Sequence, residues 1–185
     1  MTRPDLHKEL AQAGTETTLL HFKHLVALGV PRATLAAQRL DSWGWGVVNA
    51  VDVGDGLYNP GNGPLHMLLP VWNAEDLIDL VAFRSSNPAD WRLRTGLGLA
   101  LGLEGGWERH HWEDEVSLSL TPLDWLRDGA DGLCIVDWDA PEIAMLASLP
   151  RIVCPTRESA SQLRQALTRP QPLPPIILKE TRLAA

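Results

Sequence analysis

Hydrophobic residues in the first part of the chain recur at the spacing of an α-helix. In residues 15–40 they follow one another at intervals of three or four, the pattern of a helix that buries one face. Gly29 interrupts the pattern, and Pro31 suits the first turn of a following helix. The pattern predicts two helices between residues 15 and 40, within a helical segment of residues 1–44.

A period of two replaces the helical period from residue 45 onward. Apolar and polar residues alternate between turn residues such as Asp55-Gly56, which is typical of strands joined by hairpins. The pattern therefore predicts an antiparallel β-meander over residues 45–103. The expected strands cover residues 46–53, 57–58, 65–71, 77–83 and, at the edge, 91–95.

Residues 104–185 change rhythm again. Short apolar runs at 116–120, 132–136 and 151–154 alternate with helical patterns at 122–127, 141–149 and 158–167. This alternation favours a small parallel sheet with helices packed on it. The whole chain is predicted to be a mixed α+β or α/β protein, with the helical segment, the meander and the α/β unit in one globule. A last short strand is expected at 176–178.

Length and composition fit a folded domain. The 185 residues are 45% hydrophobic and 21% charged, enough apolar side chain to form a core. No run approaches the roughly 20 apolar residues that a membrane-spanning helix needs. We expect a soluble, cytoplasmic protein without membrane contact, in which both Cys134 and Cys154 are buried thiols.

The formal charge of −7 is unevenly distributed. Residues 104–142 contain eleven acids and two arginines, a local balance of −9, whereas residues 143–185 contain six Arg or Lys and two Glu, a balance of +4. The acidic total argues against nonspecific nucleic-acid binding by the whole surface. The acidic total is still compatible with a local basic face toward the C-terminus.

Arginines and tryptophans supply candidate contact residues. Arg92 and Arg94 follow Trp91 on an expected strand, and other arginines lie on or next to the last predicted helix. Arginine binds phosphate groups, and an exposed tryptophan ring stacks on bases. We expect most of the eight tryptophans to pack in the core, because a buried indole N–H finds a partner readily. The predicted nucleic-acid contacts are Trp91, Arg92, Arg94, Arg157, Arg164 and Arg169.

Two acids form the candidate cation site. Asp137 and Asp139 follow an apolar run at the carboxyl end of an expected strand, where α/β proteins open their ligand sites. Paired carboxylates there suit magnesium. Two pairs of histidines are less suited to a metal. His110 and His111 are neighbours whose side chains point apart, and the helix that carries His21 and His24 offers no third ligand.

The order of segments resembles the Toprim domain region of phage- and plasmid-type DNA primases. A glycine-containing turn leads into an apolar strand that ends in Pro70-Val71, as in the segment that precedes Toprim in those primases. Residues 116–125, 132–150 and 151–167 resemble the strand and helix units of the domain itself.

The resemblance implies a cation-binding set that this chain lacks in part. Family members place a glutamate after the first strand and an Asp-x-Asp after a later one, to hold magnesium for phosphoryl transfer. Here the first position falls near Thr121-Pro122 and the later one at Pro155-Thr156-Arg157. If 133–136 is the later strand instead, Asp137 and Asp139 are retained but one unit is missing.

Three functional hypotheses follow. The first is a degenerate, noncatalytic relative of primase domains that needs no cofactor and binds single-stranded nucleic acid or a replication protein in a replication, mobile-element or phage setting. The second is a magnesium-dependent nucleotidyl transferase or nuclease that uses Asp137 and Asp139. The third is an interaction module whose acidic residues 104–142 bind a basic partner.

Overall fold

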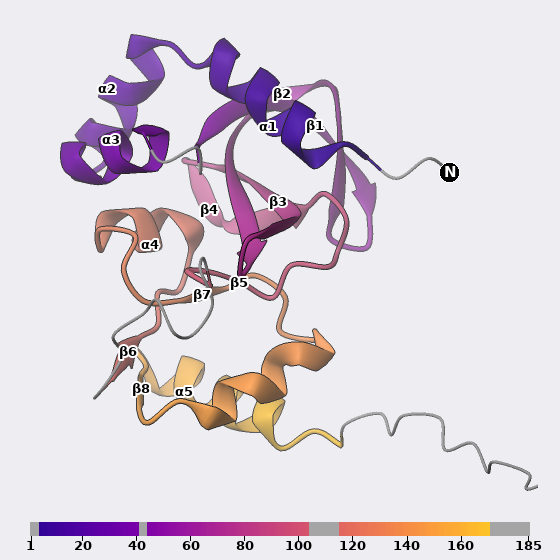
Figure 1. Ribbon diagram of the computed structural model, residues 1–185, viewed down its shortest axis with the longest axis vertical. Helices are drawn as coiled ribbons and strands as arrows, with labels where there is room; N and C mark the ends of the chain where they lie inside the picture. Colours follow the sequence, from indigo (N-terminus) through magenta and orange to yellow (C-terminus); the bar gives the residue numbers. More distant parts are fainter. Residues whose placement is uncertain (1–3, 41–43, 104–114, 171–185) are drawn as a thin grey trace, which may run out of the picture.

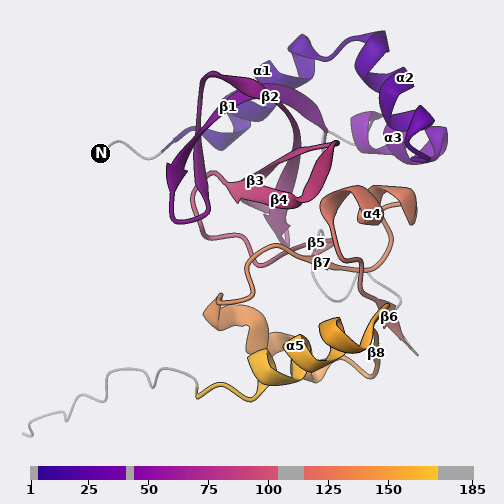
Figure 2. The same ribbon diagram turned by 180° about the vertical axis from the view of Figure 1, so that it is seen from behind.

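A computed structural model describes residues 4–40, 44–103 and 115–170 of the chain. Within these ranges it describes the side chains of all residues except 38–40. Three helices come first, a four-stranded sheet follows, and short strands alternate with helices in the last third (Figure 1). The mixed α+β class predicted from the sequence is confirmed. In both views the helices α2 and α3 lie at one end of the molecule and α5 at the other (Figures 1 and 2).

The N-terminal helices are α1 (Leu6–Glu16), α2 (Leu19–Ala27) and α3 (Arg32–Leu40). The two helices predicted between residues 15 and 40 are confirmed as α2 and α3. Helix α1 was not predicted as a separate element. Its cap is local, because the Asp5 carboxylate accepts a hydrogen bond from the Lys8 backbone N–H at 3.1 Å.

The sheet contains β1 (Gly46–Gly54), β2 (Leu57–Asn73), β3 (Asp76–Arg84) and β4 (Asn87–Leu93). Its order is β1-β2-β3-β4 with antiparallel neighbours, so the predicted meander is confirmed. The two strands predicted at 57–58 and 65–71 form one strand of 17 residues. Leu57 at the start of β2 also pairs with Leu93 of β4, which shows that the sheet curls on itself.

A bulge interrupts the pairing of β1 with β2. Asn49 lies opposite Leu65, while the next residue of β1, Ala50, lies opposite Pro60. Residues 61–64 of β2 therefore have no opposite residue on β1. We call residues 61–64 the β2 bulge.

The two faces of the sheet pack against different helices. One face carries Leu69, Val81 and Phe83, which join a core cluster with residues of α2, α3 and α4 (Pro122–Arg127). The other carries Leu68, Leu80 and Ala82, which pack with α1. Both faces are thus buried against helices over part of their area.

Beyond the meander, four short strands form two two-stranded sheets. The strands are β5 (Ala100–Leu101), β6 (Val116–Ser117), β7 (Cys134–Ile135) and β8 (Ile152–Val153). Strand β6 pairs in parallel with β8, and Leu118 just beyond it bridges in parallel to Leu133 before β7. Strand β5 pairs antiparallel with β7. The predicted parallel pairing beyond Val116 is therefore confirmed.

Helices follow these strands in the predicted order. Helix α4 comes after β6, the 3₁₀ helix η1 (Pro141–Ser148) after β7, and α5 (Arg157–Leu167) after β8. The helix expected at 141–149 is present and is of the 3₁₀ type. The acidic residues 104–114 and the strand expected at 176–178 lie outside the described residues.

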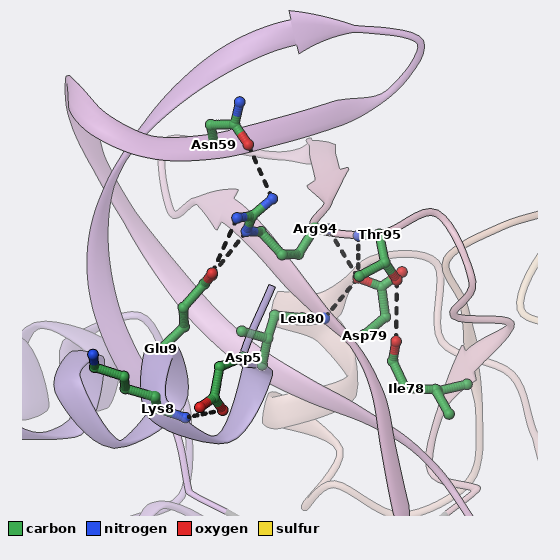
Figure 3. Close-up of polar contacts among 9 residues, drawn as sticks. All are labelled: Asp5, Lys8, Glu9, Asn59, Ile78, Asp79, Leu80, Arg94 and Thr95. Carbon is green, nitrogen blue, oxygen red and sulfur yellow. Dashed lines mark hydrogen bonds and ion pairs between the residues drawn. The ribbon is translucent and has the colours of Figure 1, made fainter. Parts of the chain in front are cut away.

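A buried carboxylate joins the sheet to the segment that leaves it. Asp79 of β3 is fully buried, and residues 94–98, which we call the Asp79 loop, wrap around its side chain. Oδ1 accepts from the backbone N–H groups of Leu80, Arg94 and Thr95 at 2.7–2.9 Å (Figure 3). Oδ2 accepts from two further N–H groups of the loop at 2.8 and 3.1 Å. The Asp79 charge is thus balanced by five backbone donors.

Arg94 ties helix α1 to this loop. Its guanidinium donates to both carboxylate oxygens of Glu9 at 2.8 and 3.0 Å, and to the Asn59 side chain at 2.9 Å (Figure 3). The Arg94 side chain is 17% exposed, so the ion pair is shielded from water. This contact positions α1 on the sheet.

None of the described helices is long and apolar enough to cross a membrane.

Candidate functional site

The carboxyl ends of the parallel strands carry hydroxyl groups at the two positions where the resemblance to Toprim domains implies acids. Thr121 follows β6 and accepts from the Asp124 backbone N–H at 3.1 Å. Thr156 follows β8 and accepts from the Ser159 N–H at 3.1 Å. Both threonines act as N-caps of the helices that follow. Their oxygens are used inside the protein.

The alternative cation residues, Asp137 and Asp139, follow β7. The Asp137 carboxylate accepts from the Asp139 backbone N–H at 2.9 Å. The Asp139 carboxylate forms an ion pair with Arg169, which also donates to the Trp138 carbonyl at 3.0 Å. Among the described residues, no three His, Cys, Asp or Glu side chains come together in an arrangement that could hold a metal ion. Magnesium would therefore have to displace Arg169 from Asp139.

The histidines predicted to be less suited to a metal, His21 and His24, form hydrogen bonds with different partners. His21 Nδ1 accepts from the Thr18 backbone N–H at 3.2 Å, and His24 Nε2 shares a 2.9 Å hydrogen bond with the Ser85 hydroxyl. These contacts turn the two rings to different partners. His110 and His111 lie outside the described residues.

The two thiols differ in burial. Burial raises the pKa of Cys134 above its ordinary value, and the nearby Asp124 carboxylate adds to the effect. Cys154 is half-buried, and partial burial also raises the pKa of its thiol. Both thiols are thus held in the protonated, unreactive form at neutral pH.

Trp91, Arg92 and Arg94 of the predicted contact set are engaged within the protein. The Trp91 ring is half-buried and its indole N–H donates to the Val136 carbonyl at 2.8 Å. Arg92 pairs with Asp52 and Asp90, and these contacts, led by the hydrogen bond to Asp52, raise its pKa further. With Arg94 held by Glu9, this part of the set has a structural role.

The described tryptophans pack mainly in cores. Trp45, Trp72 and Trp125 are at most 8% exposed, while Trp91 and Trp138 are half-buried. This agrees with core packing for the rings that the structure describes.

Helix α5 presents the remaining predicted contact residues. Arg157 and Arg164 are exposed and seven residues apart, so they lie on the same side of the helix about 10 Å from each other. Neither forms an ion pair with a carboxylate of the described residues, in contrast to Arg169. We call the exposed side of α5 that bears Arg157 and Arg164 the α5 face.

Polar uncharged residues fill the rest of the α5 face. Ser161 and Gln165 are exposed beside the two arginines, while Leu163 and Ala166 are buried on the opposite side of the helix. Glu158 is the one acid within α5. The face is thus basic and able to donate hydrogen bonds.

Asp79 and Glu9 are the polar residues that sequence reasoning missed. One signal for Asp79 was present, because a single acid in the apolar run of residues 77–83 has to be neutralised if that strand is buried. Glu9 gave no signal, since its partner Arg94 lies 85 residues away.

No protein-family model matches this chain, and the searches of the curated proteins and of the solved structures found no match either.

Proposed function

We propose that this protein is a noncatalytic binding protein that contacts single-stranded nucleic acid through the α5 face. The observation that carries the proposal is the contrast among the arginines. Arg92, Arg94 and Arg169 are held by carboxylates of the same chain, whereas Arg157 and Arg164 are exposed and no described carboxylate pairs with them. Free guanidinium groups on one helix side suit successive phosphates.

Two further features support binding at this face. The residues between the arginines are serine and glutamine, which donate hydrogen bonds to phosphate or sugar oxygens. The sequence from 143 to 185 carries a net charge of +4, which would attract a polyanion locally although the whole chain is acidic.

The noncatalytic part of the proposal is supported by how the oxygen atoms at the sheet edge are used. Thr121 and Thr156 cap helices, and Asp139 is neutralised by Arg169. A phosphoryl-transfer site needs carboxylates that are free to hold a metal ion. We therefore propose a degenerate, Toprim-like relative of primase domains acting in a replication, mobile-element or phage-related setting.

Replacing both arginines of the α5 face should weaken nucleic-acid binding. We expect Arg157→Gln/Arg164→Gln to bind a fluorescent oligothymidylate at least about tenfold less tightly at low salt, because two phosphate contacts are lost. Fluorescence anisotropy measures the affinity. The matched control is Lys23→Gln/Arg32→Gln, which removes two charges from exposed positions on α2 and α3 and should change the affinity less than twofold.

Equal losses in both double variants would mean that only total charge matters and would remove the α5 face from the proposal. An unmodified protein that does not bind the oligothymidylate at low salt would overturn the nucleic-acid part. The acidic interaction module would then be the better hypothesis.

Magnesium should not stabilise the fold through Asp137 and Asp139. We expect millimolar magnesium to shift the thermal midpoint equally in the unmodified protein and in Asp137→Asn/Asp139→Asn, because a bound ion would stabilise only a protein with an intact site. Differential scanning fluorimetry measures both. A magnesium-dependent stabilisation that disappears in the variant would support the nucleotidyl transferase or nuclease hypothesis instead.

A further inference from the structure

A polar hollow lies on the sheet face that packs with α1, and two buried residues of that packing, Ala50 and Tyr58, form part of its lining. Its volume is about 430 Å³, within the size range of small-molecule sites. The rest of the lining comes from three parts of the sheet: β1, the β2 bulge with the adjacent His66, and the β3–β4 hairpin. The ionisable side chains that line this polar hollow include those of Asp52, His66, Arg84, Asp90 and Arg92.

The β2 bulge forms one wall of the polar hollow because Gly63 can approach β1 closely. A Cβ atom on Gly63 would lie 1.7 Å from the Ala50 carbonyl oxygen, a distance no side chain can adopt. The bulge therefore depends on glycine at this position. Bulges in antiparallel sheets frequently redirect side chains next to binding sites.

The Arg92 guanidinium is held by neighbouring residues inside the polar hollow. Its Nε and Nη2 atoms lie 3.0 Å from Asp52 Oδ2, and Nη1 donates to Asp90 and to the Trp91 carbonyl. The hydrogen bond from the Gly54 N–H and the contact with Arg92 lower the pKa of Asp52. Arg92 therefore fixes the two acids, and each of its three nitrogen atoms already has a partner.

Arg84 differs from Arg92 in that its donors are available. Its only ion pair within the described residues is with Asp90, at 3.7 Å, which is beyond hydrogen-bond distance. The Arg84 side chain is 41% exposed. A planar guanidinium that is accessible and not hydrogen-bonded is suited to two oxygens of one phosphate group.

His66 offers a second donor on the same side of the sheet. Its Nδ1 lies 2.8 Å from the Pro64 carbonyl, and a carbonyl can only accept, so Nδ1 carries a proton. Burial, the Pro64 carbonyl, Arg84, Asp90 and Arg92 all act on this ring, with burial as the largest effect, and together they lower its pKa. Nε2 of the free protein is then unprotonated at neutral pH and takes up a proton when an anion is placed beside it.

We infer that the polar hollow binds the phosphate group of a nucleotide, with Arg84 and His66 as the residues that contact this anion. The phosphate lies against the Arg84 guanidinium and the protonated His66 Nε2. Asp52 and Asp90 carry the acceptors that suit a sugar hydroxyl or a base amine next to that phosphate. The α5 face shares no residue with this site, so each of the two proposals can fail without the other.

The test uses thymidine 5′-monophosphate, a phosphate monoester, and thymidylyl-thymidine, a diester without a terminal phosphate. NMR of the His66 Cε1–H signal as a function of pH gives its titration midpoint. We expect the saturating ligand to raise that midpoint by about one unit. Binding should tighten as the pH falls through the midpoint, because the protonated ring binds the anion. A response to the monoester alone assigns a free nucleotide, and a response to the diester assigns a nucleic-acid backbone.

Arg84→Gln should lower the affinity for whichever ligand gives a response by at least about tenfold. Arg32→Gln, which removes an exposed arginine on α3, should leave that affinity unchanged. The thermal midpoint of Arg84→Gln should stay near that of the unmodified protein, because Arg84 contributes only an exposed ion pair. An unchanged His66 midpoint at millimolar concentrations of both ligands would overturn the inference. Equal affinity in Arg84→Gln would overturn it as well.

Discussion

Asp79→Ala should lower the free energy of unfolding by at least about 4 kcal/mol. The substitution removes the carboxylate that accepts from five backbone N–H groups. The Arg94 N–H keeps the Leu80 carbonyl as an acceptor at 2.9 Å, and each buried donor that loses its partner costs about 1–3 kcal/mol. The total falls below the sum of these costs, because the Asp79 loop can move and expose some donors to water. Urea unfolding followed by tryptophan fluorescence measures the change.

Two further substitutions separate charge from shape at this position. Asp79→Asn keeps the shape and one acceptor oxygen, so we expect a smaller loss of about 2 kcal/mol. Asp76→Ala removes an exposed acid from the same strand and should change the stability by less than about 0.5 kcal/mol. A loss below 1 kcal/mol in Asp79→Ala would show that the Asp79 loop is not held by this carboxylate.

Gly102→Ala should lower the free energy of unfolding by at least about 3 kcal/mol, because a close contact and an unfavourable backbone angle occur together. Gly102 has φ +89°, and a Cβ atom there would lie 2.0 Å from the Gly132 carbonyl oxygen. Gly132 in turn packs on the Ser117 backbone of β6. The backbone that joins β5, β7 and β6 would have to separate, which adds overpacking to the cost of a left-handed alanine.

Two alanine substitutions at other glycines separate these causes. Gly129 has φ +88° but nothing within 4 Å, so Gly129→Ala should cost only about 1–2 kcal/mol. Gly14 lies in helix α1 with open space around it, and Gly14→Ala should stabilise by about 0.5–1 kcal/mol. Equal effects of Gly102→Ala and Gly129→Ala would contradict the close packing of Gly102 on the Gly132 backbone.

The alternation of strands and helices could be predicted because local signals mark each boundary. Thr121-Pro122 and Thr156 combine a cap residue with a change of hydrophobic period, and α4 and α5 begin there. The meander was predictable for the same reason, since Asp55-Gly56 joins β1 to β2. The joining of residues 57–58 and 65–71 into one strand was not, because it depends on pairing with two different strands.

Helix α1 was missed although it has local signals. The buried residues Leu6, Leu10 and Ala13 have helical spacing and Asp5 caps the helix, but three small or aliphatic positions in a polar segment give a weak pattern. Its place on the sheet depends on the contact of Glu9 with Arg94, 85 residues away. Such a contact leaves no trace in a short window of sequence.

The candidate contact residues also depend on distant contacts that a short window of sequence does not show. The sequence identified a group of arginines, but in a sequence every arginine looks equally free. Asp52, one partner of Arg92, lies 40 residues away, and Asp139, the partner of Arg169, lies 30 residues away. Only the structure therefore separates these paired arginines from Arg157 and Arg164. Pairing at a distance is the reason that our proposal keeps only the arginines of the α5 face from the predicted set of six contact residues.

The salt dependence of oligothymidylate binding tests the central claim most directly. For single strands, each phosphate contact contributes about 0.7 to the slope of log affinity against log salt concentration. If Arg157 and Arg164 each contact a phosphate, the slope of Arg157→Gln/Arg164→Gln should be shallower than that of the unmodified protein by about 1.4. Identical slopes in the two proteins would contradict the account, because the α5 face would then make no phosphate contact.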